Sequence, residues 1–187
     1  MEGNHLLMKH NVSIAVLAGI LLATLSILSA SGCHSGDGSC AQGATCECSE
    51  GTDCYQGCAD GDGCDLFCHN MVHCGGVCGN GCALQCHDVN DCSSSCGADC
   101  NISCHNTVSC GAFCGDNCNY DCRSVDRCGV QVGPGSTVAC TSVTTCVVEC
   151  QGTCRVSCND VNNCDVTCPG GASPTSCTNG LLACGPY

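Results

Sequence analysis

The residues best able to do chemistry in this sequence are its thiols, because 30 of the 187 residues are cysteine. A thiol can form a disulfide, hold a metal ion as a thiolate or act as a redox nucleophile. Zinc ribbons, ferredoxins and thioredoxin-type redox sites rely on the spacing C-x2-C. That spacing does not occur here, and C-x-C occurs once, at Cys46–Cys48. The spacing therefore favours disulfides over metal clusters.

Three histidines offer a second kind of chemistry. His69, His87 and His105 recur at a constant interval of eighteen. Stacked coils of that length would place them in a ladder with Cα atoms about 4.8 Å apart, which could bind zinc, copper or nickel. The same position holds other polar residues further along the chain: Arg123, Thr141 and Asn159. A repeat that tolerates polar residues at this position is therefore the alternative to a metal site.

These spacings belong to an 18-residue repeat, C-x3-C-x3-C-x3-C-x5, as in CGAFCGDNCNYDCRSVDRC at 110–128. Two series of cysteines follow this period: Cys74, Cys92, Cys110, Cys128, Cys146, Cys164 and Cys68, Cys86, Cys104, Cys122, Cys140, Cys158. Two segments of each unit alternate between inward and outward residues and predict β-strands. Gly/Asn/Asp triplets predict a short corner between them. A five-residue segment with a central apolar residue predicts a long corner.

Each unit is therefore a first strand, a short corner, a second strand and a long corner, such as 110–114, 115–117, 118–122 and 123–127. Stacked units predict an all-β fold, a disulfide-laced parallel β-solenoid with 18-residue coils. We expect it to be right-handed, as crossovers between parallel strands usually are. About six to seven coils are predicted over 54–168, a tether and irregular cap over 33–53, and an irregular cap over 169–187.

The disulfides predicted with most support cross the short corners. In the coil that starts at Cys128, the repeat places cysteines at Val132 and Ser136, and both are missing together. Loss as a pair is what a bond between these two positions would produce. The predicted bridges are Cys78–Cys82, Cys96–Cys100, Cys114–Cys118 and Cys150–Cys154. The outer cysteines stay ambiguous, since Cys110 could pair with Cys122 or with Cys104, and bonds between stacked coils are a further alternative.

The segment 1–32 differs from the rest of the chain and predicts a signal peptide, which we expect to be helical. Val12 to Leu28 is an apolar run preceded by Lys9 and followed by small residues, as in an export signal. A membrane-spanning helix is the rival interpretation. The segment ILSASGC resembles a bacterial lipobox and would make Cys33 the lipidated N-terminus. Lipidation of Cys33 would leave 29 other thiols, so one of them would stay unpaired.

The net charge argues against nucleic acid as a partner. The net charge is −13, and an acidic chain without basic clusters argues against binding nucleic acid, whose phosphates need Lys and Arg. Large aliphatic residues are scarce beyond the predicted signal peptide, so disulfides must replace much of the hydrophobic core. Such disulfides indicate an exported protein.

The signal, the lipobox-like junction and the cysteine repeats together resemble the cysteine-rich repeat lipoproteins of Gram-negative bacteria. This resemblance implies an outer-membrane or cell-surface lipoprotein tethered to the membrane through Cys33, or otherwise a secreted protein. We expect a non-enzymatic structural or adhesion module with an unidentified protein or surface partner and no cofactor. The alternative is a metal-binding or sequestering protein that uses the histidine ladder or thiols. An enzyme is the third possibility, and no catalytic residues are assigned.

Overall fold

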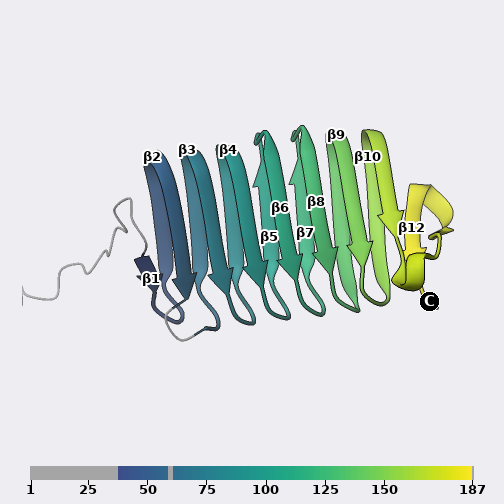
Figure 1. Cartoon of the computed structure of the whole chain (residues 1–187), viewed down its shortest axis with the longest axis horizontal. Helices are drawn as coiled ribbons and strands as arrows, with labels where there is room; N and C mark the ends of the chain where they lie inside the picture. Colours follow the sequence, from purple (N-terminus) through teal and green to yellow (C-terminus); the bar gives the residue numbers. More distant parts are fainter. Residues whose placement is uncertain (1–37, 59–60, 187) are drawn as a thin grey trace, which may run out of the picture. The chain divides into compact units, whose positions relative to one another are not determined.

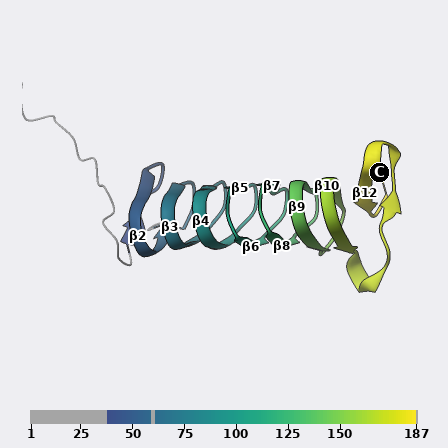
Figure 2. The ribbon, with the colours of Figure 1, turned by 90° about the horizontal axis from the view of Figure 1, so that it is seen from above.

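The computed structural model describes residues 38–58 and 61–186, which form a parallel β-solenoid of about seven turns closed by a C-terminal cap (Figure 1). Successive coils stack along one axis, and the cap strand lies beyond the last coil (Figure 2). The strands are β1 (Gly38–Cys40), β2 (Thr45–Cys58), β3 (Asp65–Cys78), β4 (Ala83–Cys96), β5 (Asn101–His105), β6 (Ser109–Cys114), β7 (Asn119–Arg123), β8 (Arg127–Val132), β9 (Ser136–Cys150), β10 (Cys154–Thr167), β11 (Thr175–Ser176) and β12 (Leu181–Cys184). The predicted fold class is confirmed.

The register follows the 18-residue repeat. Cys86 of β4 lies opposite Cys68 of β3 and Cys104 of β5, and Cys92 lies opposite Cys74 and Cys110. β2, β3, β4, β9 and β10 continue through the long corner, whereas the pairs β5/β6 and β7/β8 are interrupted there. Every coil therefore pairs with its neighbours along both of its strand segments.

In most coils the narrow interior holds a cystine at each end and one apolar pair between them. The second strand supplies the larger partner of this pair in the early coils, such as Leu66 opposite Gly76, where a Cβ on Gly76 would lie 2.6 Å from Leu66 Cδ1. In later coils the two side chains of this pair are closer in size, as with Val138 and Val148, which are both buried. Complementary side-chain sizes on the two strands thus fill the interior of coils that differ in composition.

The long corners from 69–73 onward each turn at a residue in the left-handed region. The φ angles lie between 53° and 56° at six positions that share one place in the repeat: Asn70, Asp88, Asn106, Ser124, Ser142 and Asp160. Asn and Asp tolerate this conformation better than other non-glycine residues. The next residue points inward, as expected, at Met71, Val89, Val125 and Val143. In the corner 105–109 this buried position is Thr107, while the apolar Val108 is exposed.

The coil without a short-corner cystine is filled by other means. Val132 lies opposite Cys114 and Cys150, and Ser136 lies opposite Cys154, so both occupy cystine positions. Both are buried. The Ser136 hydroxyl accepts a hydrogen bond from the backbone N–H of Cys118 at 3.0 Å and donates one to the Gly115 carbonyl at 3.4 Å. An apolar residue and a hydrogen-bonded hydroxyl therefore replace the missing bridge.

The solenoid begins earlier than the sequence predicts. The sequence predicts a tether and an irregular cap over 33–53, yet β1 and most of β2 lie within this segment, and β2 pairs with β3 from Thr45 to Gly57. Thr45 lies opposite Asp65, so this coil is longer than the repeat. The reason is the short corner between Cys58 and Cys64, which has two more residues than the later ones and shifts this coil out of the 18-residue period.

The C-terminal cap is also more regular than predicted. Residues 169–187 contain two short 3-10 helices (Pro169–Gly171 and Thr178–Gly180), and β12 pairs antiparallel with the start of β10 and with β11. A Cys168–Cys184 disulfide fastens the cap to the last coil. The predicted signal peptide over 1–32 and the predicted lipidation site Cys33 lie outside the described residues, and the handedness stays a prediction.

Candidate functional site

The predicted histidine ladder forms, but its members have separate partners. His69, His87 and His105 lie opposite one another on successive coils, and the rings of His87 and His105 are stacked with centroids 6.3 Å apart. His69 Nε2 lies 2.7 Å from Glu47 Oε1, and His87 Nδ1 lies 2.7 Å from Asp88 Oδ2. Each of these two imidazoles therefore meets a different carboxylate.

The ladder does not converge on a metal centre. Within 38–58 and 61–186, every group of three or more potential ligands whose donor atoms lie within 4.8 Å of one another consists of cysteines alone. All of these cysteines except Cys100 are in disulfides, and a disulfide sulfur is not the thiolate that binds metals. The geometry thus does not favour the metal-binding alternative.

Three of the four predicted short-corner bridges are present. Cys78–Cys82, Cys114–Cys118 and Cys150–Cys154 are disulfides with Cα atoms 6.1 to 6.4 Å apart, within the usual range. The fourth differs from the prediction, because Cys96 and Cys100 carry free thiols. This corner therefore holds two unpaired thiols where its neighbours hold a disulfide.

The ambiguity of the outer cysteines is resolved across the long corners. Cys110 pairs with Cys104, with Cα atoms 6.4 Å apart. The same six-residue separation recurs in the other long corners of the repeat, as Cys68–Cys74, Cys86–Cys92, Cys122–Cys128, Cys140–Cys146 and Cys158–Cys164. Every one of these bonds closes a loop within one corner, and none joins stacked coils.

A surface that the sequence reasoning missed lies on the outward side of the first strands. We call it the neutral face. Two columns of side chains form it: Tyr55, Gly75, Ser93, Gly111, Gly129, Val147 and, beside them, Gly57, Val77, Ser95, Phe113, Gln131. Glu149 and Asp165 are the charged residues at the corresponding outward positions of the described first strands, and both lie in the last two coils.

The neutral face carries large apolar side chains in the open. The exposed fractions are 68% for Val77, 63% for Phe113, 50% for Tyr55 and 43% for Val147. Small residues between them leave a shallow trough on each side of Phe113. The Tyr55 ring leans over Gly75, where a Cβ would come within 2.7 Å of two ring carbons. From Tyr55 to Val147 the face spans five coil steps, roughly 24 Å.

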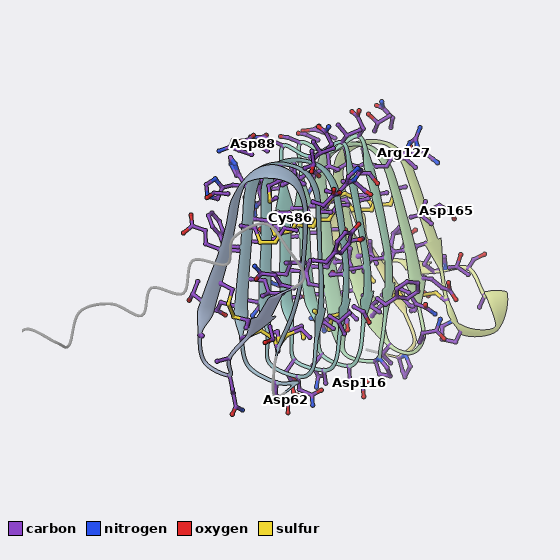
Figure 3. The ribbon with its side chains drawn as sticks, turned by 60° about the vertical axis from the view of Figure 1, so that its left-hand side comes forward. Asp62, Cys86, Asp88, Asp116, Arg127 and Asp165 are labelled. Atoms are coloured by element: carbon purple, nitrogen blue, oxygen red, sulfur yellow. A yellow bond between two sulfur atoms is a disulfide. The ribbon has the colours of Figure 1, made fainter. Side chains whose placement is uncertain are left out.

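Charge is concentrated elsewhere. Asp88 lies at the long-corner edge, and Asp62 and Asp116 lie at the short-corner edge (Figure 3). The outward side of the second strands carries Glu47, Asp65, Asp121 and Arg155 at positions in register. A signal for the neutral face exists in the sequence, since the outward residues of segments such as CGGVC, CSSSC and CGAFC are small or apolar. The face can be recognised only once the register of the first strands is known.

This combination defines a class of protein, a disulfide-rich solenoid suited to a structural or interaction role. Searches of protein-family models, curated proteins and solved structures each found no match to this chain. Among the described residues, no helix is long and apolar enough to span a bilayer.

Proposed function

We propose that the protein is an exported, lipid-anchored and non-enzymatic structural or adhesion module that makes contact through its neutral face. The observation that carries this proposal is the pairing of thirteen disulfides among the described residues with an exposed apolar surface that is free of charge over most of its length. Disulfides persist in oxidising, extracytoplasmic compartments. Exposed apolar patches on soluble proteins commonly mark interaction sites.

The disulfides support a role that requires persistence. Twelve of the thirteen close loops with a sequence separation of four or six residues. In the chain-entropy model each such loop contributes about 2 kcal/mol to stability. A fold held in this way opens rarely at any one coil, which limits the access of proteases.

Charge favours an uncharged partner for this face. The chain carries a net charge of −13, so an anionic partner is repelled by the acidic corners. A cationic partner is attracted to those corners rather than to the neutral face. An uncharged and extended ligand, such as a neutral polysaccharide, can lie along the trough between Tyr55 and Phe113 without desolvating any charge, because none of its lining residues is charged.

Adhesion is tested by the binding of the purified chain to beads of an uncharged polysaccharide. We expect retention that does not weaken between low and high salt, and that falls at least about fivefold in Phe113→Asp because burying a new carboxylate is costly. Phe67→Asp is the matched control, since Phe67 is partly exposed on the opposite, second-strand side. Equal loss in both variants, or binding abolished by salt, would contradict the assignment.

The anchor is tested separately by mass spectrometry of the mature protein from its membrane fraction. We expect an N-terminal Cys33 that carries the mass of a lipid, and release of the Cys33→Ser protein into the soluble fraction. A mature chain that begins at another residue and carries no lipid would overturn the anchor but leave the neutral face untouched.

A further inference from the structure

One short corner differs chemically from its equivalents. Cys96 lies opposite Cys78 and Cys114, and Cys100 holds the same place in the repeat as Cys82 and Cys118. The equivalent pairs on both neighbouring coils are disulfides, while Cys96 and Cys100 are free thiols in hydrogen-bond contact. The cysteine pair at this position of the repeat is therefore oxidised in the two neighbouring coils and reduced in the coil between them.

The two thiols have unequal surroundings. Cys100 is buried with 1% of its surface exposed, whereas Cys96 is partly exposed. The hydrogen bond from Cys96 lowers the pKa of the Cys100 thiol, with smaller help from the backbone at Cys82 and Gly81 and against the effects of burial and of the negative charge of Asp99. That same hydrogen bond, together with burial, raises the pKa of Cys96. The contact between the two thiols thus favours a thiolate on Cys100 over one on Cys96.

This asymmetry suits attack by an external thiol. In thiol–disulfide exchange the attacked sulfur must be accessible, and a leaving thiol of lower pKa departs faster. In a closed Cys96–Cys100 bridge, Cys96 is the more exposed of the two residues, so we take its sulfur as the one that is attacked and Cys100 as the leaving group. The corner also differs from the other short corners in having an acidic residue, Asp99, directly before its second cysteine.

We propose that Cys96 and Cys100 form a redox couple that exchanges with small thiols and disulfides, opened by two thiols RSH and closed by a disulfide RSSR through the reverse steps, while the equivalent bridges stay shut. A thiolate RS⁻ attacks Cys96 Sγ, the bond between the two cysteines breaks, and Cys100 leaves as a thiolate. A second RS⁻ then attacks the R sulfur of the mixed disulfide, forming RSSR and releasing Cys96 as a thiolate that takes up a proton. Two electrons pass from two thiols to the bridge, and the product is the dithiol seen in the structure.

The couple is tested on the whole oxidised chain in glutathione buffers of graded composition. After acid trapping and differential alkylation, peptide mapping reports the redox state of each bridge. We expect Cys96–Cys100 to be half reduced at a value of [GSH]²/[GSSG] at least about tenfold below that of Cys78–Cys82, Cys114–Cys118 and Cys150–Cys154. The proposal fails if the four pairs are reduced together. It also fails if Cys100 is recovered joined to Cys114 or Cys118, whose sulfurs lie within 4.8 Å of its own.

Single variants test the direction of attack. In Cys100→Ser, Cys96 has lost its partner and we expect a stable mixed disulfide with glutathione. The matched control is Cys118→Ser, which frees the equivalent Cys114, a residue only 7% exposed, and should carry little glutathione. Circular dichroism establishes that both variants fold. Equal adducts on Cys96 and Cys114, or none on Cys96, would overturn the assignment of the attacked sulfur.

Discussion

At the scale of single residues, the interior of the solenoid contains a small number of polar defects. The Oγ1 atom of Thr107 is buried at a position that Val89 and Val125 occupy in the neighbouring coils, and it has no hydrogen-bond partner among the described residues. Ser94 Oγ is in the same situation beside the neutral face. A buried hydroxyl without a partner costs about 1–3 kcal/mol, so these positions limit the stability of their coils.

Thr107→Val is therefore expected to stabilise the protein. The change keeps the shape of the side chain and removes the unpaired hydroxyl, and we expect a gain of about 1 kcal/mol in the free energy of unfolding. The measurement is the guanidinium chloride midpoint of the oxidised chain. Thr144→Val, in an exposed position of a later long corner, is the control and should change little. A loss of stability in Thr107→Val would show that the hydroxyl is satisfied.

Backbone conformation at single residues gives a second prediction. Ser142 has a φ of 55° in the long corner of β9, and the left-handed region costs an L-residue about 1–2 kcal/mol, with β-branched residues affected most. Ser142→Val should lower the free energy of unfolding by about 1 kcal/mol, because β-branching adds to a cost that serine already meets, whereas Ser142→Gly removes that cost and should be neutral or stabilising. Thermal unfolding of both variants, compared with Thr144→Val, measures the difference. Equal stability of the valine and glycine variants would contradict this account.

At the scale of the repeated element, close backbone contacts set the spacing of the short corners. The first residue of several of these corners is glycine, and the N–H of Gly115 donates to the carbonyl of Gly97 at 2.9 Å. A Cβ on Gly115 would lie 2.9 Å from the carbonyl carbon and oxygen of Gly97. Because both contacts are to backbone atoms, the neighbouring corner cannot give way by changing a rotamer.

Gly115→Ala should consequently destabilise the stack. We expect a loss of about 1–3 kcal/mol, the usual cost of overpacking, measured by chemical denaturation with the disulfides intact. Gly129→Ala is the matched control, since a Cβ there would meet no atom within 4 Å. Comparable losses in the two variants would indicate a general effect of removing glycine rather than a clash between corners.

At the scale of the repeated element, the sequence predicts some disulfides and coils correctly and misses others. Paired loss of cysteine at Val132 and Ser136 was enough to predict bonds across the short corners. The partner of Cys110 could not be chosen because both candidates fell within disulfide range. The coil that contains β2 was missed because two additional residues between Cys58 and Cys64 lengthen its period, and an 18-residue comparison does not detect that shift.

Other features escaped the sequence because they depend on register. The neutral face joins outward residues of six coils, and no single segment contains enough of it to be recognised. The open state of the Cys96–Cys100 pair has no sequence signal apart from Asp99, because its cysteine spacing equals that of its closed equivalents. The cap strand β12 carries no repeat and pairs antiparallel to β10, so periodicity could not reveal it.

At the scale of the whole solenoid, the cap protects the last coil. β12 pairs with Cys154–Ser157 at the start of β10, and Cys168–Cys184 holds it in place. Without the cap, the backbone N–H and C=O groups along this edge would be free to pair with another chain, as exposed sheet edges tend to do.

Truncation tests this protective role. A chain ending at Cys168, with Cys168→Ser to avoid a new free thiol, is expected to self-associate through the exposed edge of β10. Multi-angle light scattering measures the mass in solution. A chain ending at Cys184 keeps β12 and its disulfide, and serves as the control that should retain the mass of the full chain. A truncated protein that stays monomeric would show that the edge is protected by other means.

The locality of the cross-links has a consequence for how such a chain can change length. In the regular coils each disulfide joins two cysteines of one corner. Inserting or deleting a whole repeat therefore adds or removes both cysteines of each disulfide, and no cysteine is left without its partner. The strands of an inserted coil would also pair in the same register with the coil before it and the coil after it. Replication slippage by one repeat would thus lengthen or shorten the solenoid by one coil, without any need for compensating mutations.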